Sequence, residues 1–260
     1  MAKIEKHPGG NSIIFDPRWH KYTCVEQPRI KFVSGTKFLG EFFKPFDKEN
    51  VSKKYATKHG MTQKEVLDLW DAKAVLGRET GNLIHNYLEK KALGKEISHE
   101  EATRHPDKNI QEAALRKIKN ADSAFDSVSM DYDIIHPEMI VASLTHNIAG
   151  MIDILAKCKK TSKIFFLDWK SNQNIDLSNS WNSGIGPLSH LDDCSYIKYS
   201  IQLNLYQRIA MEEKYLVGPD ALTENIGRRI IHIKDDGFEF IPCPDLQKEV
   251  NDMIMSKAAE

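Results

Sequence analysis

The hydrophobic and polar positions of this chain change their period near residue 133. Before that point apolar residues recur mainly at helical spacing, and after it they form short runs and alternating patterns that are typical of strands. The pattern predicts a mainly helical part over residues 1–130 and a part built on a sheet over residues 131–260. We expect both to form one α/β domain, with a mixed central sheet flanked by helices.

Two long helices dominate the predicted first part. Thr62 and Glu65 have the spacing of a capping box, and Gly94 is a stop signal about thirty residues later. Pro45 limits any helix that begins at the turn 34–36, because proline interrupts the helical hydrogen bonds. The expected elements are short strands at 12–15 and 29–33, a short helix after 34–36, and helices over 62–93 and 107–128.

The second part reads as a series of strands followed by a helix and a hairpin. The expected elements are strands at 134–142, 148–156 and 164–170, a long polar loop at 171–195, a helix at 196–213, a hairpin of 228–234 and 238–243, and a last helix from about 245. Long ordered loops are often functional.

The third of these strands ends in charged residues although it is otherwise apolar. Side chains alternate along a strand, so Asp168 and Lys170 share one face and Trp169 lies on the other. An apolar strand buries a carboxylate and an ammonium group only if they are paired, bound to a metal or used in chemistry. Together with Asp153 on the preceding strand, they suit a divalent-cation site that cleaves phosphodiesters. A purely structural Asp–Lys pair fits these residues about equally well.

Two helical segments carry further candidates. Gly77, Gly81 and His85 recur every four residues on one helix face, and a neutral imidazole is a common ligand of Mn²⁺. Gln202 and Tyr206 also share a face, and both side chains can hydrogen-bond a phosphate or a water molecule. Ordinary helix packing explains each of these segments as well when it is taken alone.

Composition narrows the classes of protein. The net charge is −1, but residues 1–60 hold twelve Lys and Arg against six acids, so a local basic region could follow a phosphate backbone. A solvated lysine-rich face is an equal alternative. The four cysteines form no close pair, which disfavours a zinc ribbon or a disulfide framework. The sequence has no apolar run long enough for a membrane span and no targeting segment, so an intracellular protein is expected.

The four motifs, taken in order, resemble the RecB-like branch of the PD-(D/E)XK nuclease superfamily. They are G-x-x-x-H on a helix, G-x-x-D and D-x-K on successive strands, and Q-x-x-x-Y on a helix, within 77–206. The turn 34–36 and the D-W-K form of the third motif are most similar to the mitochondrial genome maintenance exonucleases and their phage relatives. The resemblance implies a restriction-endonuclease-like core and a single nuclease domain over residues 1–260.

The resemblance also implies a role for each residue. Asp153 and Asp168 would bind Mg²⁺ or Mn²⁺, with further ligands from His85 and the backbone carbonyl of Trp169. Lys170 would activate or orient the attacking water. The other implied residues are Gln202 and Tyr206, which would position the motif and the DNA backbone, and Glu138, which would support the ligands or bind a second metal ion. Some relatives hold an iron–sulfur cluster on a close C-terminal cysteine trio, but Cys243 has no such neighbours, so no cluster is expected.

The function expected from this resemblance is hydrolysis of DNA from single-stranded ends by a metal-dependent exonuclease. An endonuclease of the same fold, flap or restriction-type, is the first alternative. A non-catalytic nucleic-acid-binding module is the second, and it has no need of the acid–lysine set. The expected setting is the cytoplasm of a bacterial or phage-infected cell, with DNA as partner and a replication or recombination protein as a further candidate partner.

Overall fold

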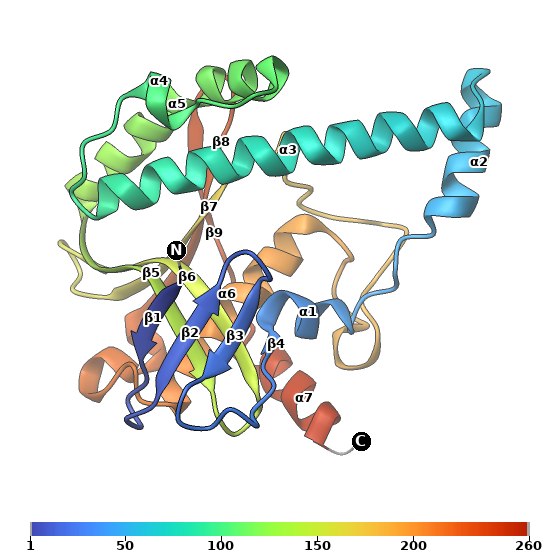
Figure 1. The fold of residues 1–260 in the computed structure, drawn as a ribbon. Coiled ribbons are helices and arrows are strands. Elements are labelled where there is room, and N and C mark those ends of the chain that lie inside the picture. Colours follow the sequence, from blue (N-terminus) through green and yellow to red (C-terminus); the bar gives the residue numbers. More distant parts are fainter. Residues whose placement is uncertain (1, 259–260) are drawn as a thin grey trace.

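The computed structural model describes residues 2–258 and shows an α/β protein with a mixed sheet between helices (Figure 1). The strands are β1 (Lys3–Lys6), β2 (Ser12–Asp16), β3 (Lys21–Cys24), β4 (Val33–Ser34), β5 (Tyr132–Ser143), β6 (Ile148–Cys158), β7 (Ile164–Lys170), β8 (Ile226–Ile233) and β9 (Phe238–Pro242). The α-helices are α1 (Gly35–Gly40), α2 (Lys48–His59), α3 (Gln63–Ala92), α4 (His99–Ala102), α5 (Lys108–Asp131), α6 (Ser195–Glu212) and α7 (Gln247–Ala258). Short 3-10 turns lie at Gly186–Leu188, Gly218–Ala221 and Thr223–Asn225.

The main sheet has six strands, and its centre is β6. β5 pairs with β6 in antiparallel fashion along almost all of its length, so β4 and β7 must share the opposite edge of β6. β4 pairs in parallel with Ile148 and Ala149, and β7 pairs in antiparallel fashion with 154–157. β8 then continues the sheet in parallel to β7, and β9 closes it as a hairpin.

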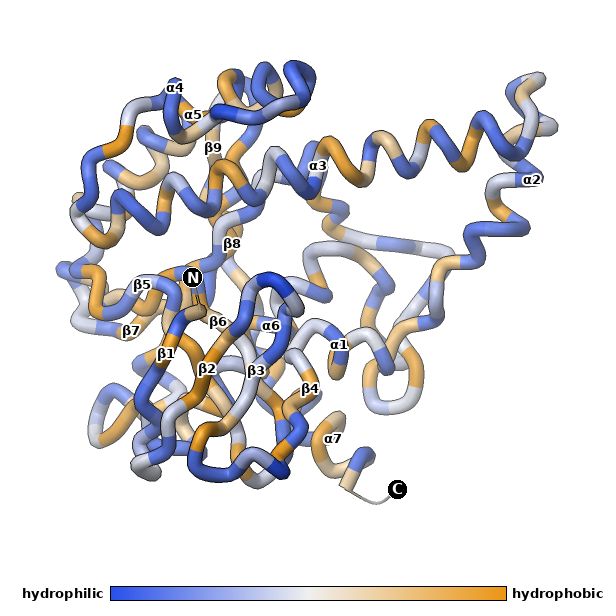
Figure 2. Tube along the Cα trace, viewed as in Figure 1, coloured by the Kyte–Doolittle hydropathy of each residue, from blue (hydrophilic) through white to orange (hydrophobic). Residues whose placement is uncertain are grey.

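Helices cover both faces of this sheet, and each face has its own apolar core. On one side α1, α6 and α7 pack against Ile152, Phe166 and Ile230, and on the other α3, α4 and α5 pack against Leu167, Trp169 and Ile231. Figure 2 shows apolar residues along the strands and interspersed with polar residues along the helices. β7 contributes alternate residues to the two cores, as the period-2 pattern predicts.

A small three-stranded sheet of β1, β2 and β3 lies against β5 and β6 (Figure 1). Its own apolar core is small and includes Ile13, Phe15 and Tyr22 against Ile140 and Ala149. The strand predicted at 12–15 is confirmed, whereas the one predicted at 29–33 is wrong, since only Val33 at its end is in a strand. The helical character of the first part therefore begins at Gly35, after a β-rich stretch.

The predicted helix signals act as expected. Ser34 caps α1, which ends five residues before Pro45, and the side chain of Ser34 accepts the backbone N–H of Lys37. Thr62 and Glu65 form a reciprocal capping box at the start of α3. The N-terminal half of α3, together with α2, extends well beyond the edge of the sheet (Figure 1).

Candidate active site

The candidate site lies where β7 separates from β6. The ladder between the two strands ends at the pair Ile154 and Leu167, so Asp153 and Asp168 no longer pair through their backbones. Instead, the backbone N–H of Trp169 donates to Asp153 Oδ2 at 2.8 Å. β7 stays paired with β8 as far as Lys170. The fork therefore brings the acids of both strands together while the sheet remains intact on the other side.

Asp168 and Lys170 form a close ion pair on the face of β7 that α6 covers. The Asp168 side chain is 7% exposed and that of Lys170 is 18% exposed, and Lys170 Nζ contacts Asp168 Oδ2. The same ammonium lies 4.7 Å from the ring centre of Tyr199 on α6. Burial alone would lower the pKa of Lys170, but Asp168 and Asp153 outweigh it and raise the pKa. Lys170 is thus held as a fixed positive charge.

His85 reaches the fork from α3 on the opposite face. Its Nε2 lies 2.9 Å from the carbonyl oxygen of Trp169, and its Nδ1 lies 3.6 Å from Asp153 Oδ2. Burial, and then the charge of Lys170, lower the pKa of His85. The imidazole is therefore neutral at pH 7, which is the form that binds metal ions.

Glu138 faces Asp153 from β5. The register pairs Pro137 with Ile154 and Met139 with Ile152, which places Glu138 directly opposite Asp153. Glu138 has a φ of +52°, in the left-handed region that costs a non-glycine residue about 1 kcal/mol or more. Such strain is typically retained at functional sites. Glu138 is therefore a full member of the cluster, closer to the centre of the site than its sequence context indicated.

The residues fit a divalent cation. One ligand atom from each of His85, Glu138 and Asp153 can be chosen so that all lie within 4.8 Å of one another. In this structure His85 Nε2 and the Trp169 carbonyl oxygen are hydrogen-bonded at 2.9 Å, so a cation held by both would replace that hydrogen bond. Asp168 is committed to Lys170 and lies outside this set. Carboxylate and carbonyl oxygens suit Mg²⁺ and Mn²⁺, and an imidazole ligand favours a transition metal such as Mn²⁺.

The acids of the cluster hold their protons unusually tightly. Burial, and then the nearby Asp168, raise the pKa of Asp153 to about 7. Burial, and then Asp153, raise the pKa of Glu138 to about 7, although Lys3 opposes the shift. Like charges that are gathered in a partly dry site repel one another, and a cation would relieve that repulsion.

Gln202 and Tyr206 lie one turn apart on α6, and only Gln202 is half-exposed. Tyr206 is 4% exposed, and its hydroxyl accepts a weak hydrogen bond of 3.4 Å from Gln202 Nε2. The Tyr206 ring fills the gap that β4 and β7 leave along the edge of β6, against Gly35 and Gly150. The interpretation of Tyr206 as a group that positions the motif therefore fits its place, whereas direct contact with DNA does not.

Substitution of Gly150 with alanine should destabilise the protein by about 1–3 kcal/mol, because overpacking a filled core forces shifts of this cost. The new Cβ would lie 2.2 Å from Cε1 of the buried Tyr206 ring. Urea unfolding measures the effect. Gly40→Ala is the matched control, since its Cβ would meet nothing within 4 Å. Equal midpoints for the two variants would contradict the tight slot around Tyr206.

Two charged residues of the site escaped the sequence interpretation. Lys3 Nζ on β1 lies 3.0 Å from Glu138 Oε2 and 2.8 Å from Glu89 Oε1 on α3. Glu89 follows His85 by four residues, so helical spacing could have revealed it.

The two glycines of the same helix face, Gly77 and Gly81, were expected to allow a close approach of another group, and the described residues show none. Gly77 meets open space, and a Cβ at Gly81 would make only ordinary contact with Ser171, so packing within the described chain does not require either glycine.

Comparison of the chain with protein-family models and with curated proteins finds no match. Among the helices of residues 2–258, none combines the length and apolar character that crossing a bilayer requires.

Proposed function

We propose that this protein is a metal-dependent DNA exonuclease with a PD-(D/E)XK core of the RecB-like branch, acting on single-stranded ends. The observation that carries the proposal is the fork of β6 and β7, where Asp153, Glu138 and His85 gather beside Lys170. This set provides ligands for Mg²⁺ or Mn²⁺ next to a fixed ammonium group. A purely structural ion pair would need neither the strained Glu138 nor the histidine.

Each residue has a distinct task in this proposal. His85, Asp153 and Glu138 would hold the cation, with the Trp169 carbonyl as a further ligand, while Asp168 would fix Lys170. The ammonium of Lys170 would orient the attacking water and stabilise the charge that develops on the phosphate. The half-exposed Gln202 would bind the DNA backbone. A divalent cation bound in such a site polarises the phosphate and lowers the pKa of water.

The loop between β7 and α6 provides a candidate surface for the bases. Trp181 in this loop is 91% exposed. Its backbone N–H donates to Asn179 Oδ1 at 3.0 Å, and Asn179 Nδ2 in turn donates to the carbonyl of Asp193 at 2.7 Å. A solvent-exposed aromatic side chain on a turn that hydrogen bonds hold in place is suited to stacking on single-stranded bases.

Trp181→Ala should weaken binding of single-stranded DNA by about fivefold or more, because stacking of one base on an aromatic ring contributes about 1–3 kcal/mol. Fluorescence anisotropy with a labelled oligonucleotide in Ca²⁺ measures this. Leu177→Ala is the control, since Leu177 is an exposed but non-aromatic residue of the same loop. Equal losses in both variants would contradict a stacking role.

The activity itself is tested with end-labelled linear and circular single-stranded DNA, in Mg²⁺, Mn²⁺ or EDTA. Degradation of the linear DNA alone, dependent on metal, is the expected result, and the position of the label gives the polarity. Cutting of the circle would favour an endonuclease. Binding without cutting of single-stranded DNA, double-stranded DNA or RNA would favour a non-catalytic module.

We further propose that the protein acts in the cytoplasm of a bacterial or phage-infected cell, where a replication or recombination protein is a candidate partner.

A further inference from the structure

The candidate site contains a second lysine, delivered by a strand that is remote in sequence. Lys3 Nζ bridges Glu89 Oε1 at 2.8 Å and Glu138 Oε2 at 3.0 Å, so one ammonium joins α3 to β5. The three side chains are 30%, 22% and 15% exposed for Lys3, Glu89 and Glu138. Partial burial makes such a pair stronger than a surface ion pair, because less water screens it.

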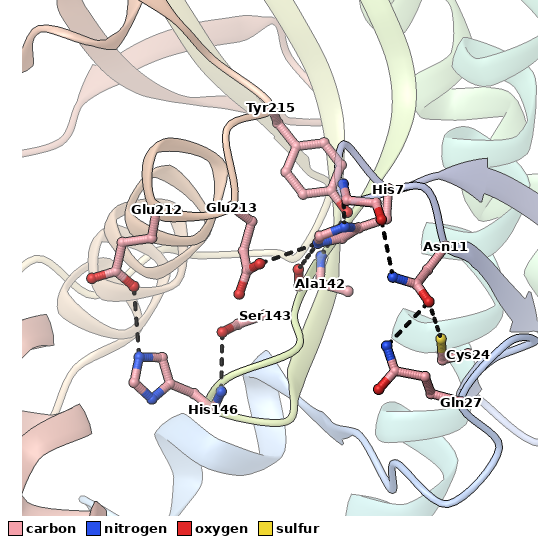
Figure 3. Close-up of polar contacts among 11 residues, drawn as sticks. His7, Asn11, Cys24, Gln27, Ala142, Ser143, His146, Glu212, Glu213 and Tyr215 are labelled. Carbon is pink, nitrogen blue, oxygen red and sulfur yellow. Dashed lines mark hydrogen bonds and ion pairs between the residues drawn. The ribbon is translucent and has the colours of Figure 1, made fainter.

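β1 is held in place by the residue that follows it. His7 is 4% exposed, and its Nδ1 accepts the backbone N–H of Gly9 at 2.9 Å. Its Nε2 therefore carries the proton and faces the carbonyl oxygen of Ala142 at 3.2 Å and Glu213 Oε2 at 3.3 Å, as Figure 3 shows. The Tyr215 ring packs edge-on against the imidazole, with ring centres 5.2 Å apart.

A second contact ties the middle of β1 to β5. Glu5 Oε2 lies 3.1 Å from His136 Nε2, two residues before Glu138. With His7 anchored beyond it, Lys3 is carried on a strand that is fixed at two points. The ammonium is therefore a built part of the site and not a mobile surface group.

The charges of the site can now be counted. Its carboxylates are Glu89, Glu138, Asp153 and Asp168, and its ammonium groups are Lys3 and Lys170. Each lysine contacts different acids, so two negative charges are in excess once all four carboxylates are ionised, as they would be around a bound cation. That excess equals the charge of a single divalent cation. A second cation about 3.5–4 Å from the first would need carboxylate oxygens to bridge or face it, and Glu138 already faces Lys3.

We propose that Lys3 takes the place of a second metal ion, so that the protein binds one divalent cation among His85, Asp153 and Glu138. This inference rests on the proposed metal-dependent function. Lys3 is a positioning residue in it, because it acts through Glu138. Its removal should free Glu138 and Glu89 to hold a second ion, since two unpaired carboxylates beside an occupied site attract a hard cation.

The test is the number of Mn²⁺ ions bound per chain, measured without DNA by electron paramagnetic resonance and calorimetry. The native protein should bind one ion and Lys3→Gln two, with the spectrum of a spin-coupled pair. Lys3→Arg keeps the charge and should bind one. Lys6→Gln is the matched control on the same strand, because Lys6 bonds Ser12 at 2.7 Å, away from the acids, and it should also bind one.

The outcomes separate this inference from the proposed function. Two ions in the native protein, or one ion in Lys3→Gln, would overturn the role of Lys3 and leave the proposed metal chemistry standing. No ion in either protein would overturn both. Lys3 lies on an edge strand and is partly exposed, so Lys3→Gln is expected to fold, and a single cooperative thermal transition in EDTA checks this.

Discussion

Lys170→Met should lower DNA cleavage by about 10³-fold or more, a loss typical of removing a group that stabilises charge in the transition state. The substitution removes the only ammonium that contacts Asp168 among the described residues, and it should leave the binding of single-stranded DNA within a few fold of native. Single-turnover cleavage in Mg²⁺ and anisotropy in Ca²⁺ measure the two effects separately.

Stability needs its own control in this experiment. Lys170→Met leaves the Asp168 carboxylate buried without its partner, and breaking a buried pair in this way costs about 3–5 kcal/mol. The double variant Asp168→Asn/Lys170→Met removes both charges and should recover most of that stability while remaining inactive. Recovery of cleavage together with stability would show that the lysine serves only the fold. Retained cleavage in the single variant would refute its proposed role directly.

The strands that carry the chemistry could be predicted from the sequence because burial imposes a clear pattern on them. β7 (Ile164–Lys170) has the predicted limits, and it sends alternate residues into two separate cores. Its last residues are charged although the rest of the strand is apolar, so Asp168 and Lys170 could be identified as site residues from the sequence. Their contact in the structure follows from the period of a strand.

The parts that escaped prediction lack such a pattern. β1 (Lys3–Lys6) half-buries two of its polar residues and leaves its one apolar residue, Ile4, exposed, so no buried apolar period marks it as a strand. Its contact with Glu138 spans 135 residues, which no local signal can encode. The resemblance alone implies a supporting or second-metal role for Glu138, and only the register with β6 reveals that it faces Asp153.

The same contrast explains Tyr206. Helical spacing places it beside Gln202, and this pair was correctly expected to share a face. Its burial depends on the gap between β4 and β7 and on the absence of a Cβ at Gly35 in α1 and at Gly150 in β6. Spacing within one helix cannot show which of the two side chains, Gln202 or Tyr206, is exposed to solvent.

Asp153→Asn should abolish metal binding and cleavage and yet stabilise the metal-free protein at pH 8. The amide oxygen can still accept the Trp169 N–H, while the buried charge is removed. The pKa of Asp153 is raised to about 7 in the folded state by burial and by Asp168, so the native carboxylate weakens the fold increasingly as pH rises from about 4 towards 7 and fully above that. One pKa unit corresponds to about 1.4 kcal/mol, so we expect a gain of about 1 kcal/mol or more at pH 8.

Urea unfolding in EDTA at pH 5, 6.5 and 8 tests this, and the gain should shrink as the pH falls. Asp133→Asn is the control, because Asp133 is an exposed acid on β5 whose removal should change stability by less than about 0.5 kcal/mol. Addition of Mn²⁺ at pH 8 should raise the stability of the native protein and leave Asp153→Asn unchanged. Equal or lower stability of Asp153→Asn at pH 8 would contradict a repulsive acid cluster, and with it the reason for a cation at the fork. Asp153→Asn distinguishes a metal site from a buried ion pair that only stabilises the fold. In a metal site the variant gains stability and loses cation binding. In a structural ion pair the variant loses stability, because the charge that it removes was stabilising.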